Sequence, residues 1–370
     1  MQNQYIGKLL DMNHQTIAIR CRSSLLAMLA AFLFSASSLA TDQITRRSDR
    51  VTFRGEFTEM TTSVVKIKQT NGQTEEIPVS DIFNVRFDME PPILAQGQSN
   101  ERSGSLDAAL EKYKQVQAEY NGDDKRLTAD LKFLIARTVV KSALADPLKQ
   151  GEAKTAIQTF RKENKTNFRL LEATLLEAQL LSADAASAAT AQELLKEVQA
   201  APVKGFQLQA GVQLGRVLLA ADDIAGALAA FDQVIQQSAG DPGSTSAQFD
   251  GLLGKALCQQ KQGQADEAIA TLDAVISKAS ESESQTLAEA WLLKGDCFRS
   301  KNLPKDALMA YLHVDVLYAS EPAAHAEALF RLAALWAPSG HQDRSDDAQA
   351  RLTEKYPNSS WAKTSDGAAP

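Results

Sequence analysis

The side chains best suited to chemistry in this sequence are two cysteines and three histidines in its second half. Cys258 and Cys297 could form a disulfide or bind a metal, and His313, His325 and His341 could bind a metal or transfer a proton. Their spacing matches no zinc motif of the HExxH or CxxC kind, and no glycine-rich phosphate loop or nucleophile motif accompanies them. We therefore expect no enzyme, no cofactor and no metal site.

A repeated helix pair must position these residues. Its clearest copy has Trp291, Gly295 and Phe298 on one helix, followed by Ala307 and Tyr311 on the next. The same step, an alanine followed four residues later by a large apolar residue, recurs at intervals of roughly 36–41 residues, at Ala191, Ala227, Ala268, Ala307 and Ala348. A period in this range is typical of a helical solenoid, in which each unit buries its apolar face against its neighbours.

These residues resemble the tetratricopeptide repeat over roughly residues 105–362. The resemblance implies a mainly α protein, built as a right-handed α-solenoid of helix pairs. Small residues are expected where helices cross and large apolar residues beside the crossings. Lys294 departs from the pattern, because a leucine is usual there. The signature residues are Gly215, Ala227, Phe231, Ala256, Ala268, Leu272, Trp291, Gly295, Phe298, Ala307 and Tyr311.

The repeat also decides between the two states of the cysteines. Cys258 and Cys297 fall at the same position of consecutive repeats. Neighbouring helix axes lie ~8–10 Å apart, whereas a disulfide needs Cα atoms within ~7 Å. We therefore expect two buried, unbridged thiols.

In the family that the repeat resembles, the first helix of each pair lines a concave groove. That resemblance implies groove positions for Val212, Leu253, Leu257 and Leu292, and partner-binding roles for Gln209, Arg216, Asp250, Lys261, Glu289, Asp296 and Arg299. These charges lack the regular set that clamps a C-terminal carboxylate in some members. Each charge alone is equally compatible with an ordinary solvated helix face.

Residues 43–90 have a different pattern, with short alternating runs and a hairpin signal at Asn71-Gly72. They predict a small antiparallel β domain, closed like a barrel and similar to Sm-like or SH3-like modules. Residues 91–104 are rich in polar residues and read as a flexible linker. Residues 363–370 read as a disordered tail.

The first 40 residues resemble an export signal. Basic residues precede the apolar run from Leu25 to Phe34, and Ser38-Leu39-Ala40 predicts cleavage after Ala40. An uncleaved membrane anchor is the alternative, although the apolar run is shorter than the ~20 residues of a spanning helix. The net charge of −7 disfavours nucleic acid and anionic lipid as partners. We expect a periplasmic or secreted protein that is not stably inserted in a membrane after cleavage.

Two functions fit these features. The first is an exported scaffold of the cell envelope whose concave groove binds another envelope protein or an extended peptide. The second is a cell-wall or saccharide-associated binding protein whose β domain holds the ligand, with the repeats as a spacer or oligomerisation arm. Self-association is compatible with both.

Overall fold

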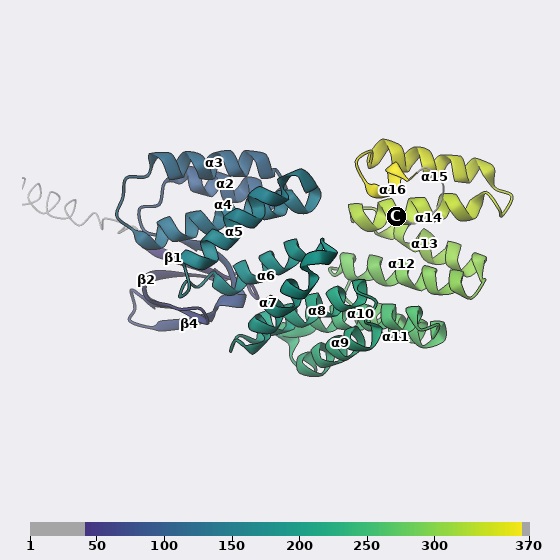
Figure 1. Ribbon diagram of the computed structural model, residues 1–370, viewed down its shortest axis with the longest axis horizontal. Coiled ribbons are helices and arrows are strands. Elements are labelled where there is room, and N and C mark those ends of the chain that lie inside the picture. The colour runs from purple at the N-terminus through teal and green to yellow at the C-terminus, as the bar shows by residue number, and fades with distance from the viewer. Residues whose placement is uncertain (1–40, 365–370) are drawn as a thin grey trace, which may run out of the picture.

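The computed structural model describes residues 41–364. The expected signal at residues 1–40, with its cleavage site at Ala40, and residues 365–370 of the expected tail lie outside the described residues. Within the described part, a small β-sheet leads into paired helices that follow an arc (Figure 1).

Five short strands form one antiparallel sheet in the order β4-β3-β2-β1-β5. The strands are β1 (Asp42–Arg46), β2 (Thr52–Met60), β3 (Val64–Gln69), β4 (Thr74–Pro78) and β5 (Ile82–Arg86), with a 3₁₀ turn η1 (Val79–Asp81) before β5. Alternate residues such as Val65 and Ile67 point into the core, as the sequence pattern predicts. Gly72 has a φ of +87°, which explains the hairpin signal between β3 and β4.

The sheet is confirmed, whereas its closure into a barrel stays a prediction. A closed barrel would join β4 to β5. Within residues 41–364, β4 and β5 are the two edge strands of the sheet and do not pair with each other.

Fifteen α-helices follow the sheet in the described part, and the first fourteen form seven antiparallel pairs. The pairs are α2 (Pro92–Arg102) with α3 (Leu106–Glu119), α4 (Lys125–Ala145) with α5 (Gln150–Glu163), α6 (Leu170–Ser182) with α7 (Ala188–Ala200), α8 (Lys204–Ala220) with α9 (Ile224–Ser238), α10 (Thr245–Lys261) with α11 (Ala265–Lys278), α12 (Ser284–Ser300) with α13 (Pro304–Leu317), and α14 (Pro322–Trp336) with α15 (Gln342–Lys355). The expected fold, a solenoid of helix pairs preceded by an antiparallel sheet, is confirmed.

The signature residues pack as the resemblance implies. Ala227, Ala268 and Ala307 are fully buried where helices cross, and Phe231, Leu272 and Tyr311 fill the space beside them. Gly215 of α8 lies directly under the Phe231 ring, where an added methyl group would come within 2.6 Å of it. Gly254 of α10 abuts the same ring. Trp291 and Phe298 are half-buried, and Lys294 places its ammonium 4.9 Å from the centre of the Trp291 ring.

The prediction of a flexible linker at residues 91–104 is wrong, because α2 occupies most of it. Pro92 stands at the start of the helix, where its missing N–H is not needed. Gly97, Ala109 and Tyr113 repeat the spacing of Gly295, Ala307 and Tyr311, and a methyl group on Gly97 would clash with the Tyr113 ring. The pair α2–α3 is therefore a repeat unit with a polar surface.

The sheet shares a hydrophobic core with the helices instead of folding around its own. Ile44 and Val85 of the sheet belong to one buried cluster with residues from α2 to α8, including Phe133 and Leu214. The result is a sheet that extends the core of the solenoid.

One polar contact and one packing contact fix the sheet on two separate helices. The buried Asp42 carboxylate accepts hydrogen bonds from the backbone N–H groups of Phe57 (3.1 Å) and Asp88 (2.9 Å) and pairs with Arg126 at the start of α4 (2.9 Å). At the other end of the sheet, Ser80 in η1 packs against Gly205 at the start of α8. The sheet therefore bridges α4 and α8, whose starts are far apart in the sequence.

A short last helix, α16 (Ser360–Lys363), closes the other end of the arc (Figure 1). Its Trp361 ring lies 5.1 Å from the centre of the Phe330 ring and 5.1 Å from the Arg331 guanidinium. This confirms the expectation that Trp361 covers the last repeat. Because α16 includes Lys363, the helix also extends one residue into the stretch expected to be a disordered tail.

Candidate functional site

The main candidate site is a groove formed by the first helices of four successive pairs, α8, α10, α12 and α14, together with Phe231 of α9. It encloses about 340 Å³. Its floor is apolar, with Leu253, Leu257 and Leu292 in the positions that the sequence predicts. We refer to it as the groove; the other residues that line it are Arg216, Leu219, Phe231, Gly254, Glu289, Leu293, Asp296 and Glu327.

The structure brings part of the predicted partner-binding set together. Arg216, Glu289 and Asp296 line the groove. Asp250 adjoins it, with its carboxylate 3.5 Å from the Arg216 guanidinium. The remaining residues of the set, Gln209, Lys261 and Arg299, are exposed on the same three helices and are not among the lining residues.

Two carboxylates lie together at the α10–α12 side of the groove. Burial raises the pKa of Asp250; Arg216 lowers this pKa, and the negative charge of Glu289 raises it further. Glu289 accepts a hydrogen bond from the Gln285 side chain (3.0 Å), and no basic side chain of residues 41–364 forms an ion pair with it. Negative charge therefore accumulates here, with Arg216 as the one nearby counter-charge in the described ion pairs.

A second acidic pair lies toward α14. Asp296 accepts a hydrogen bond from the Tyr311 hydroxyl (2.6 Å), and the Arg331 guanidinium lies 3.6 Å from Asp296 and 3.1 Å from Glu327. Burial raises the pKa of Glu327, and the charge of Asp296 adds to the effect, while Arg331 and Arg299 oppose it. The Arg331 side chain is 7% exposed, so it offsets these charges from within the protein.

Sequence reasoning missed Leu219, Gly254, Leu293 and Glu327 in the groove, and it assigned Phe231 to the repeat signature alone. Glu327 lies on α14, the first helix of the unit whose second helix carries Ala348. The repeat spacing gives no signal for Glu327, because the step of 41 residues from Ala307 to Ala348 carries the Glu289 position to Phe330. Leu219 and Leu293 line the groove because the arc turns neighbouring faces of the helices inward. The spacing of residues along one helix does not predict this turn.

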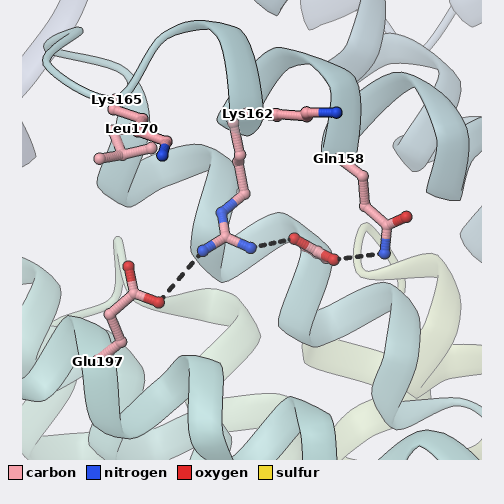
Figure 2. A pocket seen from close by; sticks show the side chains of 7 residues that line it. Gln158, Lys162, Lys165, Leu170 and Glu197 are labelled. Atoms are coloured by element: carbon pink, nitrogen blue, oxygen red, sulfur yellow. Dashed lines mark hydrogen bonds and ion pairs between the residues drawn. The ribbon is translucent and has the colours of Figure 1, made fainter.

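A larger hollow of about 440 Å³ lies between α5, α6 and α7 (Figure 2). Arg161 crosses it, pairing with Glu177 and with Glu197 (3.2 Å) and donating a hydrogen bond to Thr174 (2.9 Å). Figure 2 shows Glu197 and Gln158 on opposite sides of this charge network. Because these polar groups already satisfy one another, we interpret the hollow as a junction between helices.

The two cysteines and His325 are buried in the helix packing. Cys258 and Cys297 are buried and unbridged, as predicted, and burial raises the pKa of the Cys297 thiol to about 11. His325 is fully buried between the Tyr356 hydroxyl (2.7 Å) and Asp315 (2.8 Å), and so connects α14 to the helices on either side. Among residues 41–364 there is no group of three or more His, Cys, Asp and Glu side chains placed to hold a metal.

Comparison with known proteins supports the interpretation of the repeats. A tetratricopeptide repeat family model matches residues 218–291, which contain the centre of the groove. No curated protein sequence matches the chain. The family match supports tetratricopeptide repeats in this part of the chain, and the structural likenesses below show the fold.

Solved structures share the fold at low sequence identity. A tetratricopeptide repeat protein from Parabacteroides merdae is 14% identical, with a TM-score of 0.52, and the match covers 73% of this chain and 96% of that one. The apo form of the quorum sensor NprR from B. thuringiensis is 15% identical with a TM-score of 0.54, covering 71% and 74%. A Rap protein complexed with competence and sporulation factor is 13% identical with a TM-score of 0.50, covering 73% and 76%.

Proposed function

We propose that this chain is an exported tetratricopeptide scaffold that binds another protein of the cell envelope through an extended segment in the groove. The observation that carries the proposal is the groove itself, an apolar floor with a charged rim, built by four consecutive helix pairs. A surface of this kind supplies many shallow contacts along a chain, which suits recognition of an extended segment. The Rap protein, crystallised with competence and sporulation factor, is a precedent with the same fold.

Export is supported by the signal pattern of the first 40 residues, in which basic residues precede an apolar run and the small residues Ser38 and Ala40. The first strand, β1, begins at Asp42, two residues after the expected cut. Between residues 41 and 364, no helix combines the length and apolar character needed to cross a bilayer.

Cleavage is the first testable prediction. We expect the protein purified from the periplasm or medium to begin at Thr41, because Ser38 and Ala40 supply the small residues that a signal peptidase requires. Amino-terminal sequencing of that fraction measures this. Substitution of Ala40 by Tyr is expected to leave the longer precursor on the membrane, with Ala30→Tyr, inside the apolar run, as the control that is still cut. A membrane-bound wild type that retains its first 40 residues would contradict the export proposal and favour the anchor.

Groove binding is the second prediction, and it needs the full chain because the sheet and the solenoid share a core. A photocrosslinking residue placed at Leu257 or Leu293 is expected to join the scaffold to one discrete envelope protein in intact cells. The control position is Val316, which is 71% exposed on α13 and outside the groove. Crosslinks of equal yield from Val316, or none from either groove position, would contradict the proposal. If crosslinks to glycan strands formed only from the sheet, the saccharide-binding alternative would take its place.

A further inference from the structure

The charge of the groove constrains the partner. Three carboxylates, Glu289, Asp296 and Glu327, line the groove against one guanidinium, Arg216. Asp250 adds a fourth carboxylate beside Arg216. Buried Arg331 offsets part of the charge at the α14 end, so the least compensated carboxylate is Glu289 near the middle.

The apolar floor lies below these charges. Leu253 and Leu292 are buried, while Leu257 and Leu293 are half-buried and present apolar surface to the groove. In an extended chain, successive side chains point to opposite sides. One side of a bound segment would therefore meet the leucines while the other meets the carboxylates.

We propose that the groove selects an extended segment in which lysine or arginine residues alternate with apolar ones, and that Glu289 is the residue that receives the cationic side chain. This inference rests on the proposed function and adds the chemistry of the partner. An acidic segment is disfavoured, because its carboxylates would approach Glu289, Asp296 and Glu327 in a partly dehydrated groove. Burial is the main cause of the raised pKa values of Asp250 and Glu327, and the neighbouring carboxylates of Glu289 and Asp296 add to it.

The test uses fluorescently labelled peptides of defined sequence and the mature full-length protein. The probes are a short peptide of alternating leucine and lysine, and the matching peptides with glutamate or glutamine in place of lysine. Fluorescence anisotropy is expected to show binding of the lysine peptide, weakening as salt is raised, and at least tenfold weaker binding of the glutamate peptide (about 1.4 kcal/mol).

Variants of the protein test whether Glu289 is the residue that contacts the lysine side chains of the peptide. Glu289→Gln is expected to weaken binding of the lysine peptide about tenfold, the effect of losing one charge-assisted hydrogen bond, and Glu289→Lys is expected to weaken it further. The matched control is Glu354→Gln, an exposed glutamate on α15 outside the groove, which should leave the affinity unchanged. Circular dichroism shows whether each variant keeps its helices.

Three outcomes would overturn the inference: no binding of the lysine peptide, equal binding of the lysine and glutamate peptides, or unchanged affinity after Glu289→Lys. The crosslinking experiment separates this failure from failure of the scaffold proposal. If crosslinks from Leu257 persist in the Glu289→Lys protein, the groove binds a partner of different chemistry. If the lysine peptide binds but crosslinks from the groove are absent in cells, the chemistry holds and the cellular scaffold role fails.

Discussion

Replacing Glu101 by Gln is expected to lower the free energy of unfolding by about 3 kcal/mol at neutral pH. Glu101 is 5% exposed, and its carboxylate accepts hydrogen bonds from Arg137 (2.7 and 2.8 Å), Lys141 (2.8 Å) and the Tyr113 hydroxyl (2.9 Å). The substitution leaves Arg137 with Glu172 (3.3 Å) as its remaining partner in the described ion pairs and removes the described partner of Lys141. Weakening a buried charge network of this kind costs more than losing one surface pair. Urea unfolding followed by circular dichroism measures the change.

The control for this prediction is Glu111→Gln on the neighbouring helix α3. Its side chain is 72% exposed and pairs only with the adjacent Lys112 in the described ion pairs, so we expect a change below about 0.5 kcal/mol. A Glu101→Gln protein as stable as this control would contradict the interpretation of Glu101 as a hub.

The same carboxylate predicts how the protein responds to acid. Burial raises the pKa of Glu101, but Arg137 and Lys141 outweigh it and hold the pKa at about 2, below its ordinary 4.5. A lowered pKa contributes stability above pH 4.5, and this contribution is lost as the pH falls from 4.5 to about 2. The stability difference between the wild type and Glu101→Gln should therefore shrink across that window. A constant difference would mean that the effect of the substitution is steric.

Replacing Phe231 by Ala is expected to cost about 3–5 kcal/mol of stability. The ring is completely buried, and the small residues Gly215 and Gly254 on α8 and α10 leave the space that it fills. Its removal opens a cavity that rigid helix backbones cannot close. The loss should appear as a lower urea midpoint together with faster proteolysis near α9.

A conservative variant makes this prediction specific. Phe231→Leu keeps an apolar side chain of the kind that Leu272 supplies at the same position of the next repeat, where Ala256 takes the place of Gly215. We expect this variant to lose no more than about 1.5 kcal/mol. If the alanine and leucine variants were equally stable, the ring would not be a main support of the α8–α10 junction.

The helix pairs were predictable because each signature residue reports a contact inside its own unit or with the next one. Ala307 and Tyr311, for example, fix the crossing of α12 and α13 wherever that pair lies in the protein. The linker prediction failed because the polar composition of residues 91–104 indicates a linker, whereas their repeat spacing indicates a helix pair. Gly97, Ala109 and Tyr113 carry the repeat spacing, but they lie among polar residues whose burial depends on distant partners such as Arg137.

The candidate groove was predictable only in part, for a related physical reason. Positions on a single helix can be assigned from its period, and three residues assigned in this way, Arg216, Glu289 and Asp296, line the groove. Ion pairs between units, such as Arg331 with Asp296, depend on how far each repeat rotates relative to the one before it. The repeat signature fixes the crossing within a pair and leaves that rotation undetermined.

The bridge that the sheet makes between α4 and α8 has a mechanical consequence. A solenoid in which each unit touches only its neighbours can bend at every junction. Asp42 on Arg126 and Ser80 on Gly205 connect units that are not adjacent, and so resist bending across the first half of the arc. Bending is then confined to the segment beyond α8, which contributes the α10, α12 and α14 sides of the groove. We expect the groove to adjust its width to an incoming chain while the amino-terminal half acts as a fixed base.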